Sequence, residues 1–232
     1  MIDAAGFDLL HGLLDGASEG TLTFWAYTNT RPFDALSAAL FALVFFTYIH
    51  AGWRVGGWRT VTARFGEGGF IAGFVVAVLY VSSEYVFVFD RYSPSVVLEP
   101  IFMLSQIDLG MKVKDSSGNS FPGEHGTAVM LFSAFIWRCA GRTRGAVAIG
   151  IALLVMLPRL VAGAHWLSDL LVGSVAVVLV TAPLALATPL QQSVVGLFST
   201  VCEGLASLLW TGASSGGKPG SSDGERELHR HP

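Results

Sequence analysis

The stretch Pro158-Arg159-Leu160-Val161-Ala162-Gly163-Ala164-His165-Trp166-Leu167-Ser168-Asp169 places three ionisable side chains in otherwise apolar sequence. Such side chains are costly in a membrane, so by default they indicate function. His165 and Asp169 are four positions apart and share a helix face, where the carboxylate can orient the imidazole and leave its second nitrogen free to attack. Arg159 would lie on a different face of one continuous helix. We therefore expect the chain to turn at Ala162-Gly163-Ala164, which brings Arg159 to the same site.

A second polar motif, Ser120-Phe121-Pro122-Gly123-Glu124-His125-Gly126, precedes another apolar stretch. A helix that begins after Gly123 would direct its free amide groups and positive end at an anion. His125 then stands where a general acid could protonate a leaving oxygen. Two histidines, an aspartate and an arginine are the set that phosphoryl transfer through a phosphohistidine requires. A structural ion pair between Arg159 and Asp169 is the alternative interpretation.

The composition is typical of an integral membrane protein. Hydrophobic residues make up 52% of the chain and charged residues only 13%, whereas soluble domains carry about a quarter charged residues. No basic patch or aromatic-basic run favours nucleic-acid binding. Cys139 and Cys202 match no metal or redox spacing, and we expect neither a metal nor a cofactor.

Hydropathy predicts an all-α membrane protein with about five spanning helices. The expected spans are 33–51, 69–89, 126–140, 145–162 and 165–188. The predicted parts are an amphipathic, interfacial segment (1–32), a transmembrane catalytic domain (33–190), an interfacial helix (191–210) and a disordered tail (211–232).

Basic residues predict the orientation of these spans. They gather in the first and third loops between the spans, as Arg54, Arg59, Arg64, Arg138, Arg142 and Arg144. Both loops are therefore expected in the cytoplasm. The loop 90–124 and the turn near 160–165 then lie on the outer side, and this orientation brings both polar motifs to one face.

The R-x5-H-x3-D spacing with a preceding P-x-x-H motif resembles the type 2 phosphatidic acid phosphatase superfamily, which shares its core with vanadium haloperoxidases. Where that family usually has P-S-G-H, this chain has Pro122-Gly123-Glu124-His125. The variant is more similar to one branch, the inner-membrane lipid A phosphotransferases of Gram-negative bacteria. Further matching segments are Lys114-Asp115, Phe132-Ser133-Ala134-Phe135-x-Trp137-Arg138, Gly163-Ala164-His165-Trp166, Val172-Gly173-Ser174 and Thr28-Asn29-x-Arg31-x-Phe33-Asp34.

The resemblance, which runs from about residue 2 to 190, implies a role for each residue of the two motifs. His165 would be the nucleophile, Asp169 its orienting partner, His125 the acid and base, and Arg159 a phosphate ligand. The backbone at Gly123 would also bind phosphate.

The superfamily's first motif, K-x6-R-P, is absent in literal form. Arg31-Pro32 has Phe24 where the lysine should be. Arg91 is the better analogue and Lys114 a second one, so both are expected to bind phosphate, with ordinary attraction of lipid headgroups as the alternative. Glu124 and Arg31 are candidates for contact with a substrate headgroup, and for Glu124 exposure to solvent is the favoured alternative.

The same resemblance implies a ping-pong reaction at the periplasmic face of a bacterial inner membrane. His165 would take the terminal phosphoryl group of undecaprenyl diphosphate and pass it to the 1-phosphate of lipid A. The expected partners are these two lipids and the membrane; the residues do not indicate an oligomeric state. Two alternatives stay open. Water could accept the phosphoryl group, which makes a lipid phosphatase, or the polar cluster could be the structural ion pair of a non-enzymatic membrane scaffold.

Overall fold

The computed structural model describes residues 2–98 and 101–214. Within these residues the regular elements are all helical, and a single antiparallel bridge joins Thr30 to Val113. The helices are α1 (Ile2–His11), η1 (Gly12–Leu14), α2 (Glu19–Tyr27), α3 (Arg31–Val81), η2 (Ser82–Val86), α4 (Pro94–Val97), η3 (Leu104–Gln106), α5 (Glu124–Phe135), η4 (Ile136–Ala140), α6 (Arg142–Val161), η5 (Asp169–Ser174), α7 (Val175–Leu186) and α8 (Leu190–Ser214). The elements η2, η4 and η5 are π-helical, and η1 and η3 are 3₁₀ turns.

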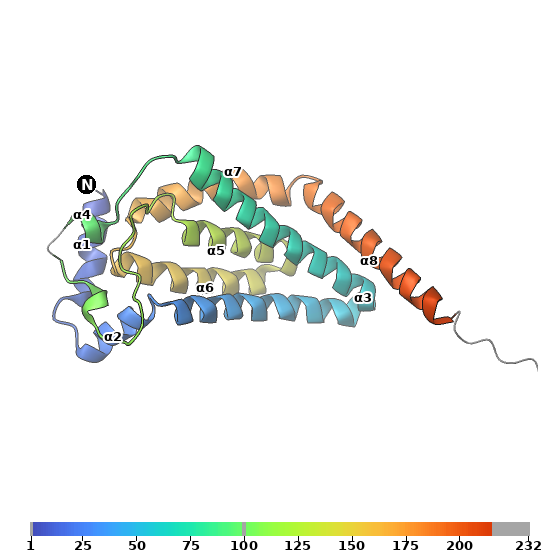
Figure 1. The fold of residues 1–232 in the computed structure, drawn as a ribbon, viewed down its shortest axis with the longest axis horizontal. Helices are drawn as coiled ribbons and strands as arrows, with labels where there is room; N and C mark the ends of the chain where they lie inside the picture. Colours follow the sequence, from blue (N-terminus) through green and yellow to red (C-terminus); the bar gives the residue numbers. More distant parts are fainter. Residues whose placement is uncertain (1, 99–100, 215–232) are drawn as a thin grey trace, which may run out of the picture.

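Helix α3 is a hairpin of two long arms rather than one straight rod. Gly57 has φ 58° and ψ −146°, a conformation outside the helical region that glycine adopts without a steric penalty. The chain doubles back there, and the second arm returns along the bundle toward α7 (Figure 1). The predicted span 33–51 lies in the first arm, and the predicted span 69–89 covers the end of the second arm and η2 but runs three residues past the last helical residue, Val86. The arms extend as helix through most of the basic loop predicted between them.

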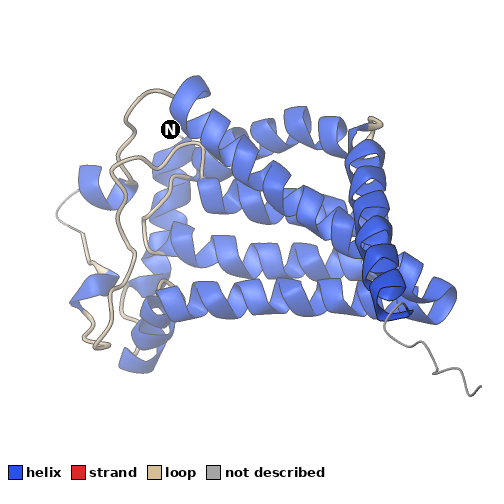
Figure 2. Cartoon of the chain, turned by 45° about the vertical axis from the view of Figure 1, so that its right-hand side comes forward, coloured by secondary structure: helices blue, strands red, loops and turns tan. Residues whose placement is uncertain are grey.

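In the part of the chain that the structure describes, three helical stretches are apolar and long enough to cross a membrane: Arg31–Val86, Arg142–Val161 and Asp169–Leu186. Together with α5 they form an elongated bundle (Figures 1 and 2). The prediction of a helical membrane protein is therefore confirmed. The predicted span 126–140 coincides with α5 and η4, and the number of crossings stays a prediction.

The core of the bundle lies where α3, α5 and α6 meet, and its most deeply buried side chains are Ile71, Leu131, Phe135, Ile136 and Ala148. Lipid is as apolar as these side chains, so close packing rather than exclusion from water holds the helices together. At Gly126 an added Cβ would lie 2.5 Å from Leu170 Cδ2 and 2.6 Å from Ser174 Oγ. Glycine at this position thus allows the start of α5 to approach η5, the element that begins with Asp169.

One end of the bundle carries the polar elements. Helices α1, α2 and α4 and the loop 101–123 gather there, whereas the turn of the α3 hairpin lies at the opposite end (Figure 1). The described part of the N-terminal segment, 2–32, packs on this end: Phe7, Leu14 and Ala26 are buried, and Val161 O lies 3.0 Å from His11 Nδ1. The N-terminal segment is therefore part of the structure that surrounds the two motifs.

Helix α8 follows Pro189 and crosses the end of the bundle at an angle to the other helices, with Val195 and Phe198 against Gly66 of α3 (Figures 1 and 2). It contains the helix predicted at 191–210 and continues to Ser214, beyond the predicted start of the disordered tail. The remainder of that tail, 215–232, lies outside the described residues.

Candidate active site

The expected turn between Arg159 and His165 is present. Helix α6 ends at Val161, and Gly163 takes φ +73°. A Cβ at Gly163 would lie 3.0 Å from Phe7 Cε2, so both the backbone conformation and the close approach of α1 require glycine. The amide of Ser95 donates to Gly163 O at 3.1 Å and fixes the turn to α4. Arg159 and His165 consequently line the same cavity.

His165 is oriented mainly by a backbone carbonyl. Its Nδ1 lies 2.8 Å from Ser120 O and 3.5 Å from Asp169 Oδ2. Because a carbonyl oxygen can only accept, Nδ1 carries a proton, and in the neutral imidazole the lone pair is then on Nε2. Asp169 is the more distant partner. Its carboxylate is fully buried, with Oδ2 accepting from the amide of Trp166 at 2.8 Å and Oδ1 accepting from Arg91 Nη1 at 2.6 Å.

Arg159 is buried and faces a carboxylate that stands at the start of α3. Its Nη2 donates to Asp34 Oδ1 at 2.5 Å, and its Nη1 lies 3.3 Å from Asn29 Oδ1 and 3.4 Å from Lys114 O. Its Nε is buried without a hydrogen-bond partner. Lys114 Nζ donates to the other oxygen of Asp34 at 2.7 Å. Asp34 thus pairs with both cations, its charge balances one of their two positive charges, and an incoming phosphate must share them with it.

The second motif forms the opposite wall of the site. Gly123 takes φ +79° immediately before α5, and a Cβ there would lie 2.9 Å from Ser174 Oγ and 3.1 Å from Asp169 O. The Ser174 hydroxyl lies 2.8 Å from both Pro122 O and Gly123 O, which holds the start of α5 against η5. His125 follows in the first turn of α5, where the helix dipole and free amides favour an anion.

The cavity between these walls has a volume of about 410 Å³. Most of the residues predicted from the sequence line it, namely His125, His165, Arg159, Lys114, Gly123 and Glu124. Asp169 and Arg91 lie behind His165 and are not part of the lining, and Arg31 is exposed at the start of α3. The two cations, two histidines and helix N-terminus give the cavity the chemistry of a phosphate site.

Burial, followed by the charge of Arg159, holds the pKa of His125 well below its usual range. The exposed part of this side chain lines both the polar cavity and an apolar groove. His125, which precedes the predicted span 126–140, is therefore neutral at pH 7. The negative charge of a bound phosphate opposes the effect of Arg159 and therefore favours the protonated ring.

His125→Gln is expected to lower the rate with a lipid diphosphate by about 10²–10⁴-fold, the usual contribution of a general acid. With an aryl phosphate whose phenol is strongly acidic the loss should be much smaller, because that leaving group needs no proton. Steady-state rates on both substrates measure the difference. His50→Gln, an exposed histidine on α3, is the control. An equal loss on the two substrates would show that His125 is not the acid.

Three groups in the site were not predicted as site residues: the carboxylate of Asp34, the amide of Asn29 and the carbonyl of Ser120. Asp34 carried a usable signal, because an acid at the start of an apolar span indicates function by default. Asp34 and Asn29 also belong to the segment Thr28-Asn29-x-Arg31-x-Phe33-Asp34, which is similar to the lipid A phosphotransferase branch. The Ser120 carbonyl carried no signal, since every residue has one.

Two histidines, a buried arginine, a lysine and a helix N-terminus around one cavity in a helical membrane protein define an enzyme that acts on phosphate. Comparison with known proteins specifies the family. A sequence model of the PAP2 superfamily matches residues 69–192, a range that includes both polar motifs. The lipid A 1-diphosphate synthase of Escherichia coli (strain K12) is 32% identical over 181 residues, which are 78% of this chain and 74% of that protein. No solved structure matches the chain.

The chain belongs to the PAP2 superfamily. It is a membrane enzyme with lipid phosphatase-type activity, and its substrates are lipids.

Proposed function

We propose that this protein transfers the terminal phosphoryl group of undecaprenyl diphosphate to the 1-phosphate of lipid A, on the periplasmic side of the inner membrane. The observation that carries the proposal is the hydrogen bond of His165 Nδ1 to Ser120 O, at 2.8 Å. It leaves Nε2 unprotonated in a residue that lines a cavity with His125 and Arg159. A neutral imidazole with a fixed ring and a free lone pair is the form that attacks phosphorus.

The proposed reaction has two displacements. In the first, His165 Nε2 forms a bond to the terminal phosphorus, the bond from that phosphorus to the bridging oxygen breaks, and His125 gives a proton to the departing lipid monophosphate. In the second, an oxygen of the acceptor phosphate forms a bond to phosphorus, and the phosphorus–nitrogen bond breaks. Arg159, Lys114 and the amides at the start of α5 neutralise the transferring group in both steps.

Lipid A is proposed as the acceptor by analogy with the Escherichia coli relative, which is a lipid A 1-diphosphate synthase. The donor comes from the resemblance of the two motifs to that branch. The basic residues of the α3 hairpin and the α5–α6 turn support a cytoplasmic position for those turns, and hence a periplasmic position for the site. Hydrolysis by the same phosphohistidine is the rival function, in which water replaces the lipid acceptor.

An apolar groove beside the site is consistent with a donor that carries a long lipid chain. The groove has a volume of about 570 Å³ and lies between α3 and α5, with Asp34 and His125 at its polar end and Phe45 and Phe65 farther along. The lining helix from Asp34 to Phe45 is ~17 Å long at the usual rise per residue. An isoprenoid chain in this groove would place its diphosphate at His125.

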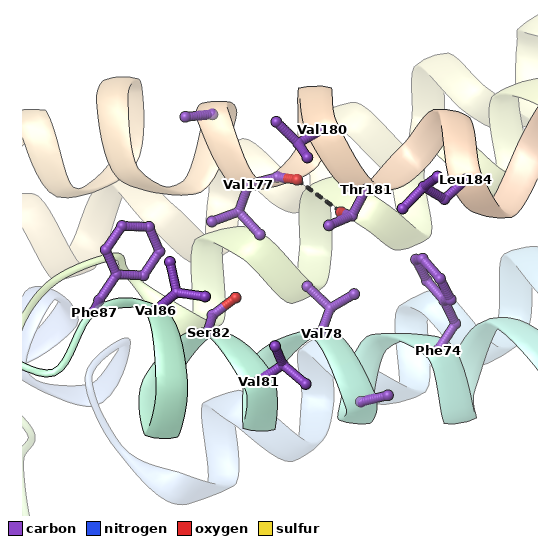
Figure 3. A pocket seen from close by; sticks show the side chains of 12 residues that line it. Phe74, Val78, Val81, Ser82, Val86, Phe87, Val177, Val180, Thr181 and Leu184 are labelled. Atoms are coloured by element: carbon purple, nitrogen blue, oxygen red, sulfur yellow. Dashed lines mark hydrogen bonds between the residues drawn. The ribbon is translucent and has the colours of Figure 1, made fainter.

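A second apolar groove, of about 370 Å³, lies between the returning arm of α3 and α7. In Figure 3, Phe74 and Val78 of α3 face Val177, Thr181 and Leu184 of α7. Its lining includes neither of the two site histidines. The groove between α3 and α5 is therefore the better place for the reacting chain.

Ala38→Trp, which fills the groove between α3 and α5, is expected to raise KM for undecaprenyl diphosphate about tenfold or more through lost apolar contact. The rate on a water-soluble aryl phosphate should stay unchanged, because that substrate has no chain. Ala77→Trp places the same side chain in the second groove and is the matched control. An equal change in KM for the two variants would contradict this placement of the chain.

The transferase and hydrolase functions are separated by one assay. Purified protein in lipid nanodiscs receives undecaprenyl diphosphate labelled with ³²P at its terminal phosphate, with and without lipid A, and the products are separated by thin-layer chromatography. Label on lipid A that depends on His165 supports the proposal. Label that appears only as free phosphate in both samples would establish a phosphatase instead.

A further inference from the structure

Arg91 joins two carboxylates that are far apart in the sequence. Its Nη1 donates to Asp169 Oδ1 at 2.6 Å, and its Nη2 donates to Asp3 Oδ2 at 2.7 Å. Asp3, in the first turn of α1, also accepts from the amide of Ser168 at 2.9 Å and from its hydroxyl at 2.7 Å. The N-terminal helix is therefore fixed both to Arg91 and to the residue directly before Asp169.

The backbone of Arg91 contacts the other group that orients His165. Ser120 donates its amide hydrogen to Arg91 O at 2.7 Å, and the carbonyl of the same Ser120 accepts from His165 Nδ1. Arg91 thus holds Asp169 through its side chain and Ser120 through its main chain. The rings of Phe121 and Trp166 lie 5.7 Å and 5.8 Å from its guanidinium carbon and limit its rotation.

These charged groups are buried or partly buried, so their interactions are less weakened by solvent than those of an exposed ion pair. The Asp169 side chain is 0% exposed, and those of Arg91 and Asp3 are 28% and 26% exposed. A buried carboxylate is stable only with a well-placed cation and further hydrogen bonds. Hydrogen bonds from Ser168 and Arg91 outweigh the effect of partial burial and lower the pKa of Asp3, so Asp3 is ionised at neutral pH. Its charge fixes the guanidinium that neutralises Asp169.

We propose that Asp3 is a positioning residue of the active site, acting through Arg91 on Asp169 and His165. In this arrangement both terminal nitrogens of Arg91 bind carboxylates, so Arg91 positions the catalytic pair in place of the phosphate-binding role predicted from the sequence. Helix α1 consequently completes the catalytic centre. The inference rests on the proposed role of His165 as the nucleophile.

The test is a comparison of kcat and KM in purified full-length variants. Asp3→Asn retains the size of the side chain but removes the charge. It should lower kcat roughly tenfold or more, the size of effect seen when metal-ligating histidines lose the carboxylate that orients them, with little change in KM. Asp3→Glu restores the charge and should recover part of kcat. Asp8→Asn makes the same substitution at an exposed position of α1 and should change neither constant.

A double variant tests the path through Arg91. Once Arg91→Gln has been introduced, Asp3→Asn should cause little further loss of kcat, because coupled residues are not additive. Thermal unfolding measured on each variant corrects kcat for the folded fraction. An Asp3→Asn enzyme with the kcat of Asp8→Asn, a change confined to KM, or additive losses in the double variant would overturn the inference. A wild-type enzyme that transfers no phosphoryl group would instead overturn the proposed function.

Discussion

His165→Asn is expected to abolish phosphoryl transfer, with a loss of at least about 10³-fold in kcat, because the variant lacks the nitrogen that forms the proposed covalent intermediate. Asparagine retains a polar side chain that can donate to Ser120 O, the partner of the imidazole in the wild-type protein. The loss should therefore come from chemistry and leave folding intact. Transfer of ³²P from labelled undecaprenyl diphosphate measures it.

His50→Asn is the matched control for this variant, since His50 is exposed on α3 outside the cavity. It should retain wild-type activity. A His165→Asn protein that keeps more than a few per cent of the wild-type rate would contradict the assignment of the nucleophile.

Arg159→Lys is expected to lower kcat by about 10²-fold, although the charge is conserved. In the guanidinium, Nη2 donates to Asp34, Nη1 donates to Asn29, and Nε has no hydrogen-bond partner. A phosphate can therefore be bound while the contact with Asp34 persists. A lysine presents one compact ammonium group, which must divide its interaction between Asp34 and the phosphate.

A second substitution tests this competition directly. In Arg159→Lys/Asp34→Asn the carboxylate no longer competes for the ammonium group, and part of the activity should return. Arg142→Lys, at an exposed position at the start of α6, is the control. Activity of Arg159→Lys within twofold of the wild type, or no recovery in the double variant, would contradict a direct role of the guanidinium fork in neutralising the phosphoryl group.

The features predicted successfully from the sequence are local in the chain. The shortage of charged residues indicates a membrane protein, and the spacing of Arg159 and His165 requires the turn that Gly163 makes. The arms of α3 were predicted as separate spans, but the basic residues between them suggested a longer loop than the single break at Gly57. Helix continues past the apolar segment because arginines are good helix formers and can reach the interface.

The features that could not be predicted depend on long-range contacts. The orientation of His165 depends on a carbonyl 45 residues away, and the partners of Arg91 lie 78 and 88 residues away. The sequence showed that Arg91 was a cation near the site, and a phosphate role followed from its charge. It could not show that α1 brings Asp3 close enough to engage the same guanidinium.

The central claim, a covalent intermediate on Nε2 of His165, is tested most directly by trapping it. Enzyme is mixed with terminally labelled undecaprenyl diphosphate without acceptor, denatured in base within the first turnover, and digested for isomer-specific analysis of phosphohistidine. We expect label on His165 at Nε2, because Nδ1 donates its hydrogen to Ser120 O. We expect no label in His165→Asn. Label at Nδ1, label on another residue, or product formation with no labelled protein would contradict it.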